Sequence, residues 1–351
     1  MRKYVCAWLL WCVACSAGGG GSKADPTDGS ASGGGPSDFP AGGGGDTTGT
    51  GAGTGAAGGG IVVARRDRDA APDGPIILTT LPSGFVQTEI GGYKLGTPLN
   101  GGTGPDAGTS GNGKRCGNVL TGVVRDFKGR AEPGGHPDFE GPLYGNDVTL
   151  HLVAAALGAD QKPVYASACE EGHASPAPTC PFGPETTTQT NFGEWYRYTA
   201  TVNEPFIVEL WFAPESDGLF TFQSLFFFPL DGSGWGNSGA DKQGKSRNFS
   251  FTTELHTQFE YKGGETFHFE GDDDVWVFIN GHLAVDLGGL HPKESGSVSL
   301  DASAIDFGIS KGGVYDMDLF HAERHTPEST FRIDTNLSFV NCGKVVPDHL
   351  H

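Results

Sequence analysis

The stretch FEGDDDVWVFINGHLAVDLGGLHP, Phe269–Pro292, decides the fold predicted for this chain. Its centre, Val275–Ile279, is a run of β-branched and aromatic residues, which is typical of a strand buried on both faces. The dipeptide Asn280-Gly281 follows, and it tolerates the positive φ that both centres of a type I′ turn require. His282–Leu287 is then expected to return as the second strand. The stretch therefore predicts a β-hairpin with acidic residues at its mouth.

Three consecutive carboxylates, Asp272, Asp273 and Asp274, enter this hairpin. In a regular strand Asp272 and Asp274 point to one face and Asp273 to the other. The residues alone leave two interpretations open. Asp272 and Asp273 could cap the turn through Asx-type hydrogen bonds beside Gly271. Alternatively, a cis peptide could bring neighbouring carboxylates together around a hard cation such as Ca²⁺, which prefers about six to eight oxygen ligands.

The chain of 351 residues is acidic and rich in glycine, with a formal net charge of −19 and 58 glycines. This charge argues against nucleic acid as a partner, because phosphate binding needs a basic face. It is compatible with Ca²⁺ or with neutral ligands such as sugars. Aromatic residues make up 11% of the chain and only two residues are Met, a balance that favours sheets over helical bundles.

Residues 1–15 have the pattern of an export signal. Arg2 and Lys3 supply the positive charge, and the apolar run that follows is too short to span a bilayer. The sequence CVACS at Cys12–Ser16 resembles a bacterial lipoprotein box. It predicts lipidation of Cys15 and an outer-membrane location at the cell surface, with the lipid as the only membrane contact. An ordinary secretory signal cleaved nearby is the alternative.

The rest of the chain divides into four parts. Residues 16–74 are predicted to be a disordered linker, because the Gly, Ser, Thr and Ala that dominate them bury too little apolar surface to fold. Residues 75–118 are expected to be an N-terminal extension of the domain, 119–345 the domain itself, and 346–351 a tail.

The domain shows short strand signals separated by Gly, Pro, Asn and Asp, and no long segment has helical periodicity. This pattern predicts an all-β fold, an antiparallel β-sandwich or barrel. Besides the central hairpin, the expected strands are Val119–Phe127, Val148–Val153, Glu194–Thr201, Phe206–Phe212, Leu219–Phe228, Asn248–Leu255, Gln258–Tyr261, Thr266–Phe269, Ser297–Leu300, Val314–Phe320 and Thr330–Val340.

Four cysteines remain once the signal segment is set aside: Cys116, Cys169, Cys180 and Cys342. An even number in an exported chain predicts disulfides, and three pairings are possible. Cys169 and Cys180 bracket a short Pro-rich loop and are expected to pair with each other. Cys116 would then pair with Cys342 and join the entry of the domain to its exit.

His321, Glu323 and His325 alternate in a way that would place them on one strand face, where they could bind Zn²⁺. The alternative is a solvated hairpin end at which Glu323 pairs with Arg324 or Arg332. No enzyme is predicted, since no carboxylate pair can be singled out for glycoside hydrolysis and no Ser/His/Asp set stands out.

Several long motifs stand out over roughly Val119–Val340. They are VRDF at Val124–Phe127, HPDF at His136–Phe139, FFFPLDGSGWG at Phe226–Gly236, NFSFTTELHTQFEY at Asn248–Tyr261, GDDDVWVFINGHLAVDLGGLH at Gly271–His291 and LFHAERHTPESTFRI at Leu319–Ile333. Together they resemble the fibro-slime domain of bacterial surface proteins. That domain is a relative of the protective-antigen-type domain, a β-sandwich of bacterial toxins, yeast flocculins and slime-mould differentiation factors.

The resemblance implies a calcium site. In the flocculin-type lectins an Asp-Asp pair joined by a cis peptide binds Ca²⁺, which in turn coordinates sugar hydroxyls. The matching pair here is Asp272-Asp273 or, as the second choice, Asp273-Asp274. Those lectins complete the shell with an Asn side chain and backbone carbonyls, whereas the matching loop, about His321–Ser329, offers Glu323 and no Asn.

These observations together predict a cell-surface lipoprotein whose sandwich binds extracellular polysaccharide in a calcium-dependent way, in adhesion or matrix assembly. Trp235 and His282 are candidates for the rim of the ligand site, although Trp235 could instead pack its loop against the domain. The alternative is a structural matrix component that uses the same domain for protein–protein contact.

Overall fold

The computed structural model describes residues 77–99, 117–141, 147–167, 169, 180 and 183–346. They all belong to one compact unit, Arg66–His351. The predicted signal with Cys15, the predicted linker, Cys116 and residues 347–351 lie outside the described residues. None of the helices that the described residues form is long and apolar enough to cross a membrane.

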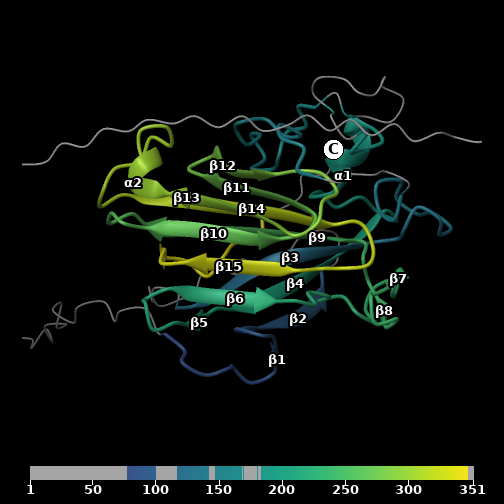
Figure 1. The fold of residues 1–351 in the computed structure, drawn as a ribbon, viewed down its shortest axis with the longest axis horizontal. Coiled ribbons are helices and arrows are strands. Elements are labelled where there is room, and N and C mark those ends of the chain that lie inside the picture. The colour runs from purple at the N-terminus through teal and green to yellow at the C-terminus, as the bar shows by residue number, and fades with distance from the viewer. Residues whose placement is uncertain are drawn as a thin grey trace, which may run out of the picture. The chain divides into compact units, whose positions relative to one another are not determined.

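The larger of two sheets, sheet A, is nine-stranded and antiparallel (Figure 1). Its strands follow the order β1-β2-β4-β3-β9-β14-β11-β12, with β16 paired to β9. Their bounds are β1 Val86–Gln87, β2 Gly92–Pro98, β3 Val119–Phe127, β4 Asn203–Trp211, β9 Phe251–Glu260, β11 Asp274–Ile279, β12 His282–Leu287, β14 Val314–Glu323 and β16 Ser338–Phe339.

The second sheet, sheet B, has five antiparallel strands in the order β13-β10-β15-β6-β5. A separate hairpin, β7–β8, lies at the end of the sheets toward which β10 runs, on the right of Figure 1. The bounds are β5 Ala213–Pro214, β6 Phe220–Ser224, β7 Gly239–Ala240, β8 Ser246–Arg247, β10 Thr266–Gly271, β13 Glu294–Ser299 and β15 Phe331–Thr335, and two short helices are α1 Gln189–Glu194 and α2 Leu300–Ser303.

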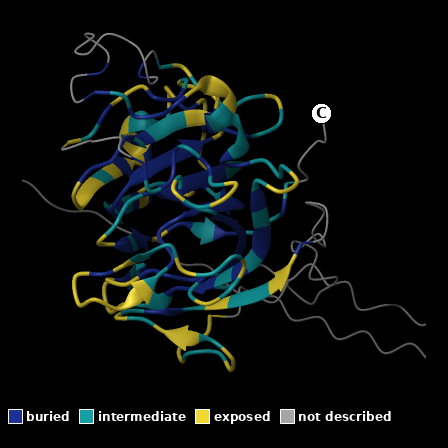
Figure 2. Cartoon of the chain, turned by 90° about the vertical axis from the view of Figure 1, so that its right-hand side faces the viewer, coloured by how far each residue is buried: buried dark blue, intermediate teal, exposed yellow. Residues whose placement is uncertain are grey.

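The core between the sheets forms because their strands alternate apolar and polar residues. In β10, Phe267 and Phe269 are buried while His268 and Glu270 are half-buried, which is the alternation that the sequence predicts. Burial of each Phe contributes about 1.5–3 kcal/mol. Figure 2 shows the resulting arrangement, with buried residues in the strands at the centre of the domain and exposed residues in turns and strands at its edges. The predicted antiparallel β-sandwich is confirmed.

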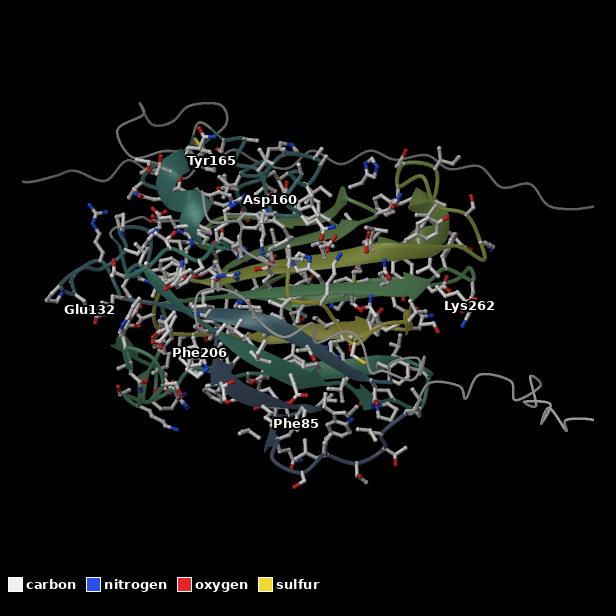
Figure 3. The ribbon with its side chains drawn as sticks, turned by 180° about the vertical axis from the view of Figure 1, so that it is seen from behind. Phe85, Glu132, Asp160, Tyr165, Phe206 and Lys262 are labelled. Atoms are coloured by element: carbon white, nitrogen blue, oxygen red, sulfur yellow. A yellow bond between two sulfur atoms is a disulfide. The ribbon has the colours of Figure 1, made fainter. Side chains whose placement is uncertain are left out.

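The central strand β11 is buried on both faces, as predicted. Val275, Val277 and Ile279 belong to the core between the sheets. Trp276 and Phe278 face the other way and pack into a second apolar cluster with residues of α1 and of the described segments 128–141, 147–167 and 183–202. Figure 3 labels Asp160 and Tyr165 in this cover over sheet A.

The hairpin turn also agrees with the sequence, since Asn280 and Gly281 have φ of 50° and 78°. The irregular layer that covers sheet A was not predicted, and two of the predicted strands lie in this layer and do not form. Val148–Val153 forms turns, and Glu194–Thr201 begins at the last residue of α1 and continues in turns. Their aromatic and β-branched residues fit a buried surface, which is what β-propensity measures, but here that surface is a cover over a sheet.

The expected N-terminal extension contributes two strands to sheet A. Strands β1 and β2 pair with each other, and β2 pairs with β4. The two strands expected at Asn248–Leu255 and Gln258–Tyr261 are one continuous strand, β9.

The predicted disulfide between Cys169 and Cys180 is present, with 5.3 Å between the two Cα atoms. Both cysteines belong to the apolar cluster of the cover. Cys342 is also disulfide-bonded. Its predicted partner, Cys116, lies outside the described residues, so that pairing stays a prediction.

Candidate functional site

The acidic residues lie where the chain crosses between the sheets. Strand β10 of sheet B ends at Gly271 and β11 of sheet A begins at Asp274. Asp272 and Asp273 therefore bridge the two layers at one end of the sandwich. Gly271 is required there, because a Cβ would lie 2.3 Å from the carbonyl oxygen of Thr330. The peptide bond between Asp272 and Asp273 is cis, as the resemblance implies for the first-choice pair.

The three aspartates do not act as one group. Asp272 Oδ1 accepts a hydrogen bond from Thr330 N at 2.5 Å, and Asp273 Oδ2 accepts one from Arg324 N at 3.1 Å. Asp274 instead accepts from the Arg324 side chain, with 2.6 Å between Nε and Oδ2, and from Gly289 N at 2.6 Å. Both oxygens of Asp274 are thus occupied, so this predicted ligand forms a buried ion pair.

Glu323 joins Asp272 and Asp273 at the end of β14. It is fully buried, and its pKa is raised well above the ordinary value by burial and then by the charges of Asp273 and Asp272. Its Oε1 accepts a long hydrogen bond from His325 N, at 3.4 Å, and the Ser329 side chain also interacts with the carboxyl group and lowers its pKa. Its Oε2 has no geometric hydrogen-bond partner among the described residues. The side chain thus lies beside two further carboxylates with an oxygen to spare.

The predicted pairing of Glu323 with an arginine is wrong. Arg324 is engaged by Asp274, and Arg332 binds Asp334 with 2.6 Å between Nε and Oδ2. Arg324 directly follows Glu323 at the end of β14, and neighbouring side chains along a strand point to opposite faces, so Arg324 points away from Glu323.

The cluster Asp272, Asp273 and Glu323 carries more negative charge than its surroundings compensate. Burial raises the pKa of Asp272 to about 6, and burial raises the pKa of Asp273 well above its ordinary value although Arg324 lowers it. Oxygen donors of this kind suit a hard cation. Among the described residues, however, no three or more His, Cys, Asp and Glu side chains form a set that could hold a metal ion. Any ion bound here needs backbone oxygens or water to complete its shell.

His321 orients the crossing segment. Its ring is buried, its pKa is lowered to about 4 by burial, and its Nε2 lies 3.1 Å from the carbonyl oxygen of Asp272. The neutral ring must carry its proton on Nε2, since a carbonyl can only accept. The His-Glu-His face considered for Zn²⁺ does not continue to His325: β14 ends at Glu323, and His325 Nδ1 contacts Thr326 O at 2.6 Å.

A pocket of about 290 Å³ opens beside Asp272. Its apolar wall includes Leu225 and Phe226, which are 42% and 45% exposed, and its polar rim includes Lys242 and Lys293. This combination of an exposed ring, polar side chains and a carboxylate is what a small polar ligand requires.

Neither predicted rim residue lines this pocket. Trp235 lines a different pocket, with Tyr198 among its neighbours, and Lys128 Nζ lies 5.0 Å from the centroid of its ring. His282 pairs with Ile279 at the far end of β11 from Asp274, about 17 Å away at ~3.3 Å per residue. The turn that makes the hairpin also carries His282 away from the acidic mouth.

Sequence reasoning missed the residue that organises this end of the sandwich, Arg324. Its guanidinium is fully buried, binds Asp274, donates to the carbonyl oxygen of Glu185 at 2.9 Å and lies 4.6 Å from the ring centroid of Trp195. An arginine between Glu323 and His325 reads as part of a solvated turn, and nothing local shows that the cover buries it.

Comparison with known families identifies the part of the chain that carries this site. Residues 214–347 match the PA14 domain. All residues that line the pocket beside Asp272, as well as Asp273 and Glu323, fall inside the matched segment.

Two relatives come from Dictyostelium discoideum. The protein psiD is 38% identical over 212 residues, which is 58% of this chain and 39% of psiD. The protein psiR is 36% identical over 221 residues, 59% of this chain and 20% of psiR. The match thus spans about two fifths or less of the length of these relatives. The narrower resemblance to the fibro-slime domain stays a prediction.

Two solved structures are also similar. The match to the PA14 domain of the MpAFP antifreeze protein covers 27% of this chain and 51% of the antifreeze-protein chain, at 13% identity and a TM-score of 0.20. The match to the PA14 sugar-binding domain from an RTX adhesin covers 66% of this chain and 99% of the adhesin domain, at 8% identity and a TM-score of 0.23. No conclusion about the site follows from superpositions this weak.

Proposed function

We propose that this chain is a cell-surface lipoprotein whose PA14 domain binds carbohydrate with the help of Ca²⁺, in adhesion or matrix assembly. The observation that carries the proposal is the pocket beside Asp272, whose lining combines the exposed ring of Phe226 with the buried carboxylate of Asp272. Sugars present apolar faces that pack on aromatic rings and hydroxyls that need polar partners. Lipidation at Cys15 and export are part of the proposal and concern residues outside those described.

The ion would be held by Asp272 and Asp273, with backbone oxygens or water completing its shell, and Glu323 would add its negative charge beside it. Two features support this role of Glu323: its Oε2 has no hydrogen-bond partner within the described part of the chain, and the charges of Asp273 and Asp272 raise its pKa. A bound Ca²⁺ would offset these charges and offer open positions to hydroxyl oxygens. Asp274 is left out of the set because Arg324 already neutralises it.

The proposal is one of binding without catalysis. A Gly-x-Ser-x-Gly spacing does occur, at residues 308–312, but Ser310 is exposed and lies in a turn between α2 and β14, not in a strand-to-helix elbow. Its amide N–H donates to Tyr315 Oη at 2.8 Å, and no base is placed beside its hydroxyl by any contact among the described residues.

The test is a calorimetric Ca²⁺ titration of the wild type, Asp272→Asn and Asp273→Asn, with Asp306→Asn as the control. Asp306 is an exposed carboxylate outside the site. Each site variant is expected to bind Ca²⁺ at least about tenfold more weakly, because ligand charge sets affinity, and the control to be unchanged. Unchanged affinity in both site variants would move the ion elsewhere. A glycan array with and without chelator then tests sugar binding, and no binding in either condition would favour the structural matrix component.

A further inference from the structure

The pocket beside Asp272 has a feature that calcium-dependent sugar binding does not require. Two lysines from different segments line it: Lys242 from the β7–β8 turn and Lys293 from the β12–β13 loop. The chain has 42 acidic and only 23 basic residues. Asp272 and Glu328 also line the pocket, so its lining holds as many ammonium groups as carboxylates and is enriched in positive charge relative to the chain as a whole.

Both lysines are available to a ligand at small cost. Lys242 Nζ lies 2.6 Å from Glu328 Oε1, with side-chain exposures of 54% and 51%. Lys293 Nζ lies 2.8 Å from Glu270 Oε1, with exposures of 48% and 29%. Exposed pairs of this kind contribute only about 0–1 kcal/mol, so an incoming anion can replace either glutamate as the partner.

The acidity of the rest of the chain does not prevent this. At physiological ionic strength the Debye length is about 8 Å, so distant carboxylates are largely screened while groups that touch the ligand are not. The pocket, at about 290 Å³, is at the small end of the range for ligand sites, roughly 300–1,000 Å³. It therefore suits a single sugar unit that rests on Phe226 and carries its charge toward the rim.

We propose that this pocket selects an acidic sugar unit, with the ammonium groups of Lys242 and Lys293 receiving its carboxylate and the Phe226 ring receiving its apolar face. This inference rests on the proposed function, because it names the ligand class of the same pocket. A lysine acts as a point charge with three donors and gives no bidentate geometry, so the selection is for charge and not for one particular uronic acid.

The test compares the methyl glycosides of glucuronic acid and glucose by calorimetry, in calcium-containing buffer. The proteins are the wild type, Lys242→Gln/Lys293→Gln and the control Lys262→Gln. Lys262 is a matched control, since it is 52% exposed, is paired with Glu260 at 3.5 Å and does not line this pocket. The wild type and the control are expected to prefer the glucuronoside about tenfold, the effect of one hydrogen bond to a charged group. The double variant should lose that preference and keep its affinity for the glucoside.

Three results would overturn the inference. Equal affinity of the wild type for the two glycosides would show no selection for charge. A preference that survives in the double variant would come from the calcium ion alone, and a preference that Lys262→Gln also removes would be a long-range effect. If the wild type binds neither these glycosides nor any sugar on the array, the proposed function itself fails and the inference with it.

Discussion

Replacement of Arg324 by Met is expected to destabilise the domain severely, because it leaves the carboxylate of Asp274 buried without a cation. Both side chains are fully buried, with 2.6 Å between Nε and Oδ2. Breaking a buried pair by removing one partner costs about 3–5 kcal/mol. At about 2–4 °C per kcal/mol for a domain of this size, the melting temperature should fall by about 6–20 °C.

The loss should depend on pH with a definite sign. Burial already raises the pKa of Asp274, and without Arg324 that pKa rises further. A carboxyl group whose pKa is higher in the folded state stabilises the fold only while it is protonated. The deficit of Arg324→Met relative to the wild type should therefore grow as pH is raised from about 4.

Urea denaturation from pH 4 to 8 measures both effects, and Arg332→Met is the control. Arg332 is 32% exposed and pairs with Asp334, so its loss should cost no more than about 1 kcal/mol. Adding Asp274→Asn to Arg324→Met should restore part of the stability, because no unpaired charge then remains. A cost for Arg324→Met no larger than that of the control would refute the reasoning.

Two further predictions concern other buried carboxyl groups. Glu323→Gln replaces a carboxyl group that burial and the charges of Asp273 and Asp272 make hard to ionise with a neutral amide. The melting temperature in chelator should therefore rise or stay constant, while the increase caused by added Ca²⁺ shrinks. An unchanged calcium response in thermal denaturation would remove Glu323 from the ion site. Burial raises the pKa of Asp126 to about 7 in the folded state, so its contribution to stability is complete below about pH 4 and is lost as pH rises through 7. The slope of unfolding free energy against pH between 4 and 7, up to about 1.4 kcal/mol per unit from this group, should therefore be smaller in Asp126→Asn, and denaturant titrations that give equal slopes would contradict this.

The part of the fold that the sequence predicted is the part governed by local patterning. The two-faced burial of Val275–Ile279, the alternation in β10 and the positive φ values at Asn280 and Gly281 are consequences of residue type and period. The short Cys169–Cys180 pairing belongs to the same class, because only the length of one loop is involved.

The site could be predicted only in part. The acidic mouth and Glu323 lie in motifs that stand out along the chain, and the structure brings Asp272, Asp273 and Glu323 together. Trp235 and His282 were assigned to the rim by residue type, and the structure carries both away from the pocket. Phe226 and the two lysines were not singled out because they come from three segments that only the folded chain makes neighbours.

By itself the sequence determined the all-β class, the central hairpin and the acidic crossing, because each depends on residues a few positions apart. Only the tertiary structure decided which charges are compensated. Arg324, in a stretch that reads as a solvated turn, is buried against Trp195 and neutralises Asp274. Glu323 next to it instead has an oxygen that no hydrogen-bond donor of the described residues reaches. The reason is that the cost of a charge depends on its distance from water and from opposite charges, and strands and loops far apart in the chain set both distances.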